Sequence, residues 1–200
     1  MKTKLRIVIA DDEPDMREYF CKMLPRLGHE VVAAAANGRE LVEHCRAQRP
    51  DLAITDIKMP ELDGIEAAIQ VYQDAPLPFI LVSAYHDADL IARAEADHIM
   101  GYLVKPIKQA DLQPAIALAL RRFEQFQALR QEAADLRQAL QDRKVIERAK
   151  GLLMKRDNVS EQEAYTHLQK IAMSQRRKLV EVAQEMTADK DHPPKPPKKT

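Results

Sequence analysis

Five short apolar runs alternate with five amphipathic segments between the N-terminus and about residue 122, and this alternation constrains the fold most strongly. We expect strands at residues 5–10, 30–36, 52–55, 79–82 and 101–104, and helices at 15–27, 38–49, 64–74, 87–96 and 108–122. Strands that alternate with helices form a parallel sheet covered on both faces, because parallel strands need crossover connections. The sequence therefore predicts an α/β domain whose functional groups lie at the carboxyl ends of its strands.

Polar side chains stand at the ends of four of these runs. The first run ends in Asp11-Asp12, the third in Asp56, the fourth in Ser83 and the fifth in Lys105. Three carboxylates at one sheet edge repel one another, so the site needs a cation, and oxygen ligands favour Mg²⁺. A lysine and a hydroxyl suit the oxygens of a phosphoryl group. The pocket is therefore predicted to accept a phosphoryl group on a carboxylate.

These residues resemble the bacterial response-regulator receiver domain, which has a flavodoxin-like fold, over about residues 4–122. Asp56 begins the segment 56–60, and Asp63-Gly64 follows it, as around the phosphorylated aspartate of that family. The resemblance implies that a sensor histidine kinase phosphorylates Asp56. We assign residues 1–122 to this domain.

The resemblance also implies the metal ligands. Asp12 and Asp56 are expected to bind Mg²⁺ directly together with the backbone carbonyl of Lys58, while Asp11 acts largely through water. Lys58 and Tyr85 flank the pocket and are expected to tune dephosphorylation.

Two further residues are implied as a switch pair. Ser83 is expected to turn toward the phosphoryl group, after which Tyr102 rotates inward. Lys105 is expected to pair with the phosphoryl oxygens, and the Lys105–Pro106 bond to be cis. Such a domain catalyses phosphoryl transfer only onto itself, so we expect a regulator rather than an enzyme.

Beyond Arg121 the apolar spacing becomes that of one continuous helix. Residues 123–142 are expected to form a coiled-coil linker about two heptads long. The stripe fits dimerisation and packing on the same chain equally well. Its apolar residues, at alternating spacings of three and four, are Phe126, Leu129, Ala133, Leu136 and Leu140.

Residues 143–188 are expected to fold as a small three-helix unit whose first helix ends near residue 157. Ser160 and Glu163 form a capping box that opens a second helix at residues 161–172.

The third helix and the core of this unit follow from the apolar pattern. Ser174 can cap the third helix, and Gly151, like Ala149, permits close helix approach. The side chains expected in the core are Ile146, Ala149, Leu153, Met154, Leu179, Val180, Ala183 and Met186.

With its lead-in helix this unit resembles the ANTAR domain, a three-helix RNA-binding module found in transcription antiterminators, over about residues 130–188. The resemblance implies that phosphorylation promotes a homodimer, which binds paired leader-RNA hairpins and prevents a terminator from forming. From residue 143 to 200 the chain holds 14 Lys and Arg against 8 Asp and Glu, a net charge of +6, which suits a polyanion. The candidate RNA contacts are Arg143, Lys144, Arg148, Lys150, Lys155, Arg156, Arg176, Arg177 and Lys178.

Tyr165 is the only aromatic residue of this unit, and packing in the core is favoured over stacking on a base. Two alternative functions remain open. One is a DNA-binding transcription factor, although the helices show no tight helix-turn-helix. The other is a protein-interaction phosphorelay component in which the helices only dimerise.

The remaining features are unremarkable for a cytoplasmic protein. No run approaches the roughly 18 apolar residues of a membrane span. Cys21 and Cys45 are expected to be buried reduced thiols. Residues 189–200, rich in Pro and Lys, are expected to be a disordered tail.

Overall fold

The computed structural model describes residues 4–84 and 99–188 of the chain. The chain divides between Ala128 and Leu129 into two compact units, which are described separately.

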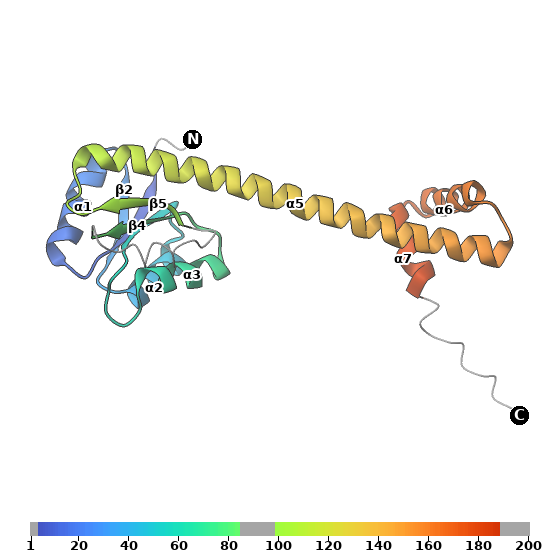
Figure 1. Ribbon diagram of the computed structural model, residues 1–200, viewed down its shortest axis with the longest axis horizontal. Helices are drawn as coiled ribbons and strands as arrows, with labels where there is room; N and C mark the ends of the chain where they lie inside the picture. The colour runs from blue at the N-terminus through green and yellow to red at the C-terminus, as the bar shows by residue number, and fades with distance from the viewer. Residues whose placement is uncertain (1–3, 85–98, 189–200) are drawn as a thin grey trace, which may run out of the picture. The chain divides into compact units, whose positions relative to one another are not determined.

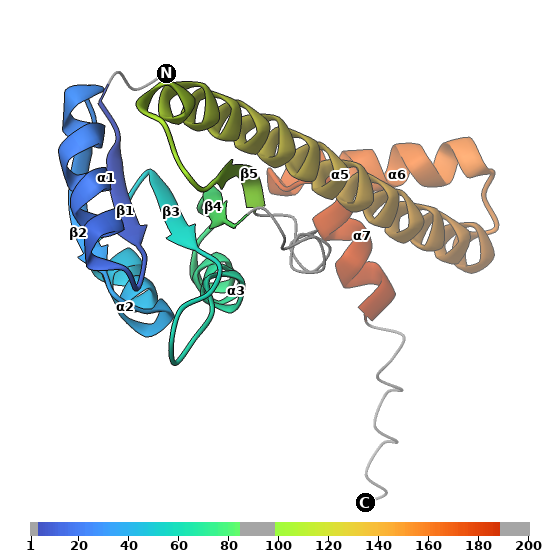
Figure 2. The same cartoon turned by 60° about the vertical axis from the view of Figure 1, so that its left-hand side comes forward.

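The first unit contains a five-stranded sheet of strand order β2-β1-β3-β4-β5, in which every neighbouring pair is parallel (Figures 1 and 2). This confirms the predicted flavodoxin-like α/β fold. The strands are β1 (Arg6–Ala10), β2 (Glu30–Ala35), β3 (Leu52–Asp56), β4 (Phe79–Ser83) and β5 (Ile99–Val104).

Helices cover both faces of this sheet, α1 (Pro14–Arg26) and the start of α5 (Gln109–Asp157) on one face, and α2 (Gly38–Gln48) and α3 (Gly64–Asp74) on the other (Figure 1). The side chains of each strand alternate between these faces, so apolar residues on both sides are buried. β1 illustrates the pattern, because Ile7 and Ile9 pack with α1 and α5 whereas Val8 and Ala10 pack with α2 and α3.

The expected strands and helices agree with the structure within about two residues at most ends. The predicted helix over residues 108–122 is the first part of the 49-residue helix α5, whose Leu112, Ile116 and Ala119 are buried against the sheet. The predicted helix over residues 87–96 lies outside the described residues.

In the second unit, α6 (Glu161–Gln175) and α7 (Leu179–Ala188) pack beside the last part of α5 (Figure 2). The predicted capping box is present, since Ser160 and Glu163 bond reciprocally at the start of α6. The shared core consists of Ala149, Leu153, Ala164, Leu168, Ala172, Val182 and Ala183.

Three predictions about the helix caps and the packing of this unit are wrong. Ser174 caps no helix, because it lies within α6 and its hydroxyl donates to the main-chain oxygen of Ile171. Met154 is 36% exposed and is not part of the core of this unit. Gly151 does not permit close helix approach, because a Cβ atom there would meet nothing within 4 Å.

The linker part of α5 keeps its apolar stripe exposed within the single chain, since Leu129, Leu136 and Leu140 are 64%, 60% and 60% exposed. The long helix therefore fits a coiled coil. Among the described residues no helix is long and apolar enough to cross a membrane.

The two cysteines are both free, and only Cys45 is buried. Burial raises the pKa of the Cys45 thiol to about 12, which makes it unreactive. The prediction that Cys21 is also buried is wrong, because this residue lies on the outer face of α1.

Candidate functional site: a carboxylate pocket at the sheet edge

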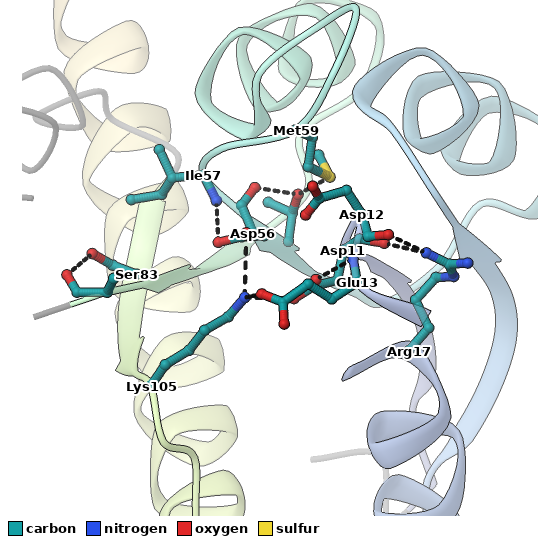
Figure 3. A network of polar contacts seen from close by, with 11 residues as sticks. Asp11, Asp12, Glu13, Arg17, Asp56, Ile57, Met59, Ser83 and Lys105 are labelled. Atoms are coloured by element: carbon teal, nitrogen blue, oxygen red, sulfur yellow. Dashed lines mark hydrogen bonds and ion pairs between the residues drawn. The ribbon is translucent and has the colours of Figure 1, made fainter. Parts of the chain in front are cut away.

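The polar residues predicted at the strand ends lie together at the carboxyl edge of the sheet (Figure 3). Asp11 and Asp12 follow β1, and Asp56 is the last residue of β3. One carboxylate oxygen of each lies within 4.8 Å of the others. Asp11 and Asp56 are buried, whereas Asp12 is exposed, so the cluster opens to solvent on one side.

Lys105, which follows β5, points its ammonium group into this cluster (Figure 3). Its Nζ lies 2.8 Å from Glu13 Oε1, 3.2 Å from Asp11 Oδ2 and 3.4 Å from Asp56 Oδ2. Burial alone would lower the pKa of Lys105. The hydrogen bond to Glu13 and the charges of Asp56 and Asp11 outweigh burial and hold that pKa above its usual range.

Burial disfavours the charged form of two of these carboxylates, Asp56 and Asp11. Burial raises the pKa of Asp56 to about 6, against the opposing effect of Lys105. Burial also raises the pKa of Asp11, although its Oδ1 accepts a hydrogen bond from the main-chain N–H of Glu13. One lysine therefore does not fully compensate this set of carboxylates.

The cluster has the chemistry of a magnesium site. Asp11 Oδ2 is buried and, although 3.2 Å from Lys105 Nζ, receives no hydrogen bond from any described residue. A buried carboxylate oxygen whose described partner is this single lysine, beside two further carboxylates, suits a hard divalent cation with oxygen ligands. Asp11, Asp12 and Asp56 are therefore the residues whose side chains fit Mg²⁺.

Three further neighbours support the carboxylates, and the sequence had pointed only to Gly64 among them. Arg17 donates from Nη1 to the main-chain oxygens of Asp11 and Asp12, at 2.7 and 3.0 Å (Figure 3). Glu13 pairs with Lys105, as described above. Gly64 begins α3 against the backbone of Asp56, where a Cβ atom would lie 2.0 Å from the main-chain oxygen. Asp63-Gly64 marked this segment in the sequence, but Arg17 carried no signal.

The remaining pocket residues lie around this cluster. Ser83 is buried and its hydroxyl donates to the main-chain oxygen of Ala84, while Tyr102 is 37% exposed. The predicted cis bond between Lys105 and Pro106 is present. Lys58 is exposed beside the pocket. Tyr85 lies outside the described residues.

The basic residues predicted to contact RNA lie in the second unit, and all but Lys150 are exposed. Lys144, Arg148 and Lys155 are spaced so that they share one face of α5 with Gly151. Arg156 pairs with Asp157 at 2.7 Å, and Arg177 pairs with Glu185. Arg143, Arg176 and Lys178 complete the exposed set.

Two residues of this unit are placed differently from the predictions. Lys150 is only 7% exposed, because its Nζ pairs with Glu147 at 2.8 Å and Glu161 at 2.6 Å, so it is not part of an exposed basic surface. Tyr165 is 39% exposed rather than buried in the core, and Lys150 Nζ lies 5.9 Å from the centre of its ring.

Comparison with known proteins agrees with both units. The family model described as response regulator receiver domain matches residues 7–117, and that of the ANTAR domain matches residues 134–186. The transcriptional regulatory protein PdtaR of Mycobacterium tuberculosis is 41% identical over 179 residues, which cover 90% of this chain and 87% of that protein. The chemotaxis protein CheY of Bacillus subtilis is 40% identical over 107 residues, or 53% of this chain and 88% of CheY.

Solved structures of receiver domains resemble the first unit. The receiver domain of a modulated diguanylate cyclase from Desulfovibrio desulfuricans aligns with a TM-score of 0.56 and 29% identity, over 60% of this chain and 96% of that one. The receiver domain of NarL from Mycobacterium tuberculosis aligns with a TM-score of 0.55 and 28% identity, over 59% and 97% of the two chains. The chain belongs to the response regulators of two-component systems and combines a receiver domain with an ANTAR domain.

Proposed function

We propose that a sensor histidine kinase phosphorylates this response regulator on Asp56, and that the phosphorylated homodimer binds hairpin RNA and prevents transcription termination. The observation that carries the first step is the position of Lys105 Nζ, 3.4 Å from Asp56 Oδ2 in a pocket with two further carboxylates. The ANTAR match over residues 134–186 supports the second step. We propose a cytoplasmic location, because the protein must meet both the sensor kinase and newly made RNA.

The pocket residues suit phosphoryl transfer in distinct ways. Asp56 supplies the nucleophilic carboxylate, and Lys105 and the hydroxyl of Ser83 neutralise and bind oxygens of the transferred group. Asp11, Asp12 and Asp56, with the backbone carbonyl of Lys58, would hold Mg²⁺, which supplies charge neutralisation when bound. Ser83 and the exposed Tyr102 form the proposed switch. Because the phosphoryl group stays on this chain, the protein acts as a regulator rather than as an enzyme.

The face of α5 that carries Lys144, Arg148 and Lys155 supports binding of a polyanion. Gly151 lies on this face, and nothing stands within 4 Å of the place of its missing Cβ. A phosphate backbone could therefore approach the helix closely between basic side chains. We propose this face as the main backbone contact, with Arg143, Arg176 and Lys178 as further exposed cations.

The exposed stripe of Leu129, Leu136 and Leu140 supports the homodimer. Three leucines that are at least 60% exposed at heptad-like spacing leave apolar surface that a second copy of the helix would cover. A seam of about two heptads is marginal by itself. Phosphorylation of the receiver can therefore control whether it forms.

The test is binding of the full chain to a labelled two-hairpin leader RNA, with and without phosphoramidate and Mg²⁺. Affinity should rise with the donor in the wild type and stay low in Asp56→Ala. Binding should also weaken steeply with salt, because phosphate contacts release counterions. If confirmed phosphorylation of Asp56 leaves RNA binding absent in every state, the antitermination proposal is wrong.

A further inference from the structure

A pocket of about 590 Å³ lies in the second unit between α5 and the first turns of α6. It is an open hollow on the surface rather than an enclosed cavity. Every side chain that lines it is polar or aromatic, unlike the apolar core next to it. The lining residues are Lys150, Glu161, Gln162, Tyr165, Thr166 and Gln169.

The ring of Tyr165 lines this pocket, is supported from one side and is partly exposed to solvent. It belongs to α6, and Lys150 Nζ from α5 lies 5.9 Å from its ring centre, a distance at which a cation attracts the π face. Lys150 is itself held by Glu147 and Glu161, with 9% of its side chain exposed. The ring thus has a supported position while 39% of the residue remains open to solvent.

The charges of the pocket disfavour a phosphate group. Lys150 bonds two carboxylates, so the three charged groups carry a net charge of −1. Glu161 is 67% exposed and offers carboxylate oxygens to a ligand. Its neighbours Gln162 and Gln169 each provide an amide with both donors and an acceptor. Such a surface accepts N–H groups well and repels anions.

We propose that this pocket takes one unpaired base of the RNA, stacked on Tyr165 and bound at its edge by Glu161, Gln162 and Gln169. An aromatic ring stacks on any base, whereas a carboxylate acceptor selects bases with an exocyclic amino group. The pocket therefore prefers adenine, cytosine or guanine over uracil. The inference rests on the RNA-binding function proposed above and adds where the loop sequence is read.

Lys150 has a positioning role in this site. Its cation holds Tyr165 and Glu161 instead of contacting phosphate. The α5–α6 pocket therefore recognises an RNA base, whereas the exposed cations Lys144, Arg148 and Lys155 contact the RNA phosphates.

The experiment uses the full chain, activated with phosphoramidate and Mg²⁺, and a pool of two-hairpin RNAs with randomised loops. The wild type should enrich RNAs that exclude uracil at one loop position. Tyr165→Ala should bind the enriched RNA roughly 10- to 100-fold more weakly, the range expected for the loss of one stacked base. Tyr165→Phe, which keeps the ring, should bind within about twofold of the wild type.

An abasic nucleotide at the enriched position locates the contact. It should weaken wild-type binding at least as much as Tyr165→Ala does, and it should weaken that variant much less than it weakens the wild type. Circular dichroism melting of both Tyr165 variants checks that the unit is folded. Equal affinity of wild type and Tyr165→Ala, or wild-type binding without loop enrichment, would overturn the pocket while sparing the proposed function. Absence of any wild-type RNA binding would overturn both.

Discussion

Gly64 lies directly against the peptide carbonyl of Asp56, because a Cβ atom at Gly64 would stand 2.0 Å from that oxygen and 2.9 Å from Thr55 Oγ1. Helix α3 therefore starts in contact with the strand end that carries the proposed phosphoacceptor. In Gly64→Ala either the helix or Asp56 must move. We expect the free energy of unfolding to fall by about 1–3 kcal/mol in urea denaturation, and phosphorylation by phosphoramidate to slow.

Gly151→Ala is the matched control, since the same change there meets nothing within 4 Å. Gly151 lies inside helix α5, so alanine should raise the free energy of unfolding by up to about 1 kcal/mol. If phosphates approach this backbone as proposed, the same variant should bind RNA more weakly despite its greater stability. Equal stability of Gly64→Ala and wild type would contradict the close contact at Asp56.

The raised pKa of Asp56 predicts a pH-dependent effect of Asp56→Asn without divalent ions. Burial raises this pKa from 3.8 to about 6, so the folded protein holds a proton that the unfolded chain releases in this window. The contribution of Asp56 to stability is therefore lost as pH rises from about 4 to 6 and stays lost above it. Asparagine removes this penalty. We expect Asp56→Asn to be more stable than wild type at pH 7.5, with the difference shrinking as pH falls below about 6 and vanishing near pH 4.

Solvent screening limits how much the free energy of unfolding can differ between Asp56→Asn and the wild type. The pKa rise corresponds to about 3 kcal/mol at most, and the partly open pocket reduces it to about 1 kcal/mol. Urea denaturation in EDTA at several pH values measures it. Adding Mg²⁺ should stabilise the wild type more than the variant and reduce the gap. A constant difference from pH 4 to 7.5 would rule out the raised pKa as its cause.

The sheet and the carboxylate pocket could be predicted because their signals are local. Apolar runs mark buried parallel strands, and the residues that end them meet at one edge whatever the details of packing. Arg17 gave no such signal, since a basic residue on a helix resembles any other. Its role depends on where α1 places the guanidinium relative to two carbonyls.

In the second unit, too, the sequence could not distinguish the roles of two neighbouring basic residues. Arg148 and Lys150 both fit a basic helix surface in the sequence, but only Lys150 faces Glu161, which α6 brings back against α5. The exposure of Tyr165 has the same cause. Ala164 and Leu168 face the core, so the neighbouring Tyr165 ring lies on the outer side of α6. A helical period identifies a buried face, yet it does not say which residue a second helix will cover.

Lys105→Gln should separate phosphorylation from metal binding. Lys105 contacts three carboxylates, so its loss removes the cation closest to the proposed phosphoryl site. We expect phosphorylation by phosphoramidate to slow on the order of 10²-fold, as when one electrostatic partner of a developing charge is removed. Mg²⁺ affinity should hold or rise, because a competing cation is gone. Phosphate-affinity gels and Mg²⁺ titration measure the two effects, with the exposed Lys108→Gln as control.

Leu136→Glu tests whether the stripe on α5 is the dimer seam. Leu136 is 60% exposed in the single chain, so the change should alter the stability of the monomer by no more than about 0.5 kcal/mol. In a dimer the same position would face its counterpart, and two buried glutamates would repel each other. Sedimentation velocity after treatment with phosphoramidate and Mg²⁺ should show a dimer for the wild type and a monomer for the variant.

The matched control is Gln138→Glu, an exposed position off the stripe, which should leave the dimer intact. RNA affinity then links the seam to function. If the two hairpins are bound by two copies, Leu136→Glu should lose most of the gain in affinity that phosphorylation gives, because two linked contacts exceed one by about 10²-fold or more. A Leu136→Glu protein that still dimerises would place the interface elsewhere. One that is monomeric but binds the two-hairpin RNA at full affinity would show that dimerisation is not the step that phosphorylation controls.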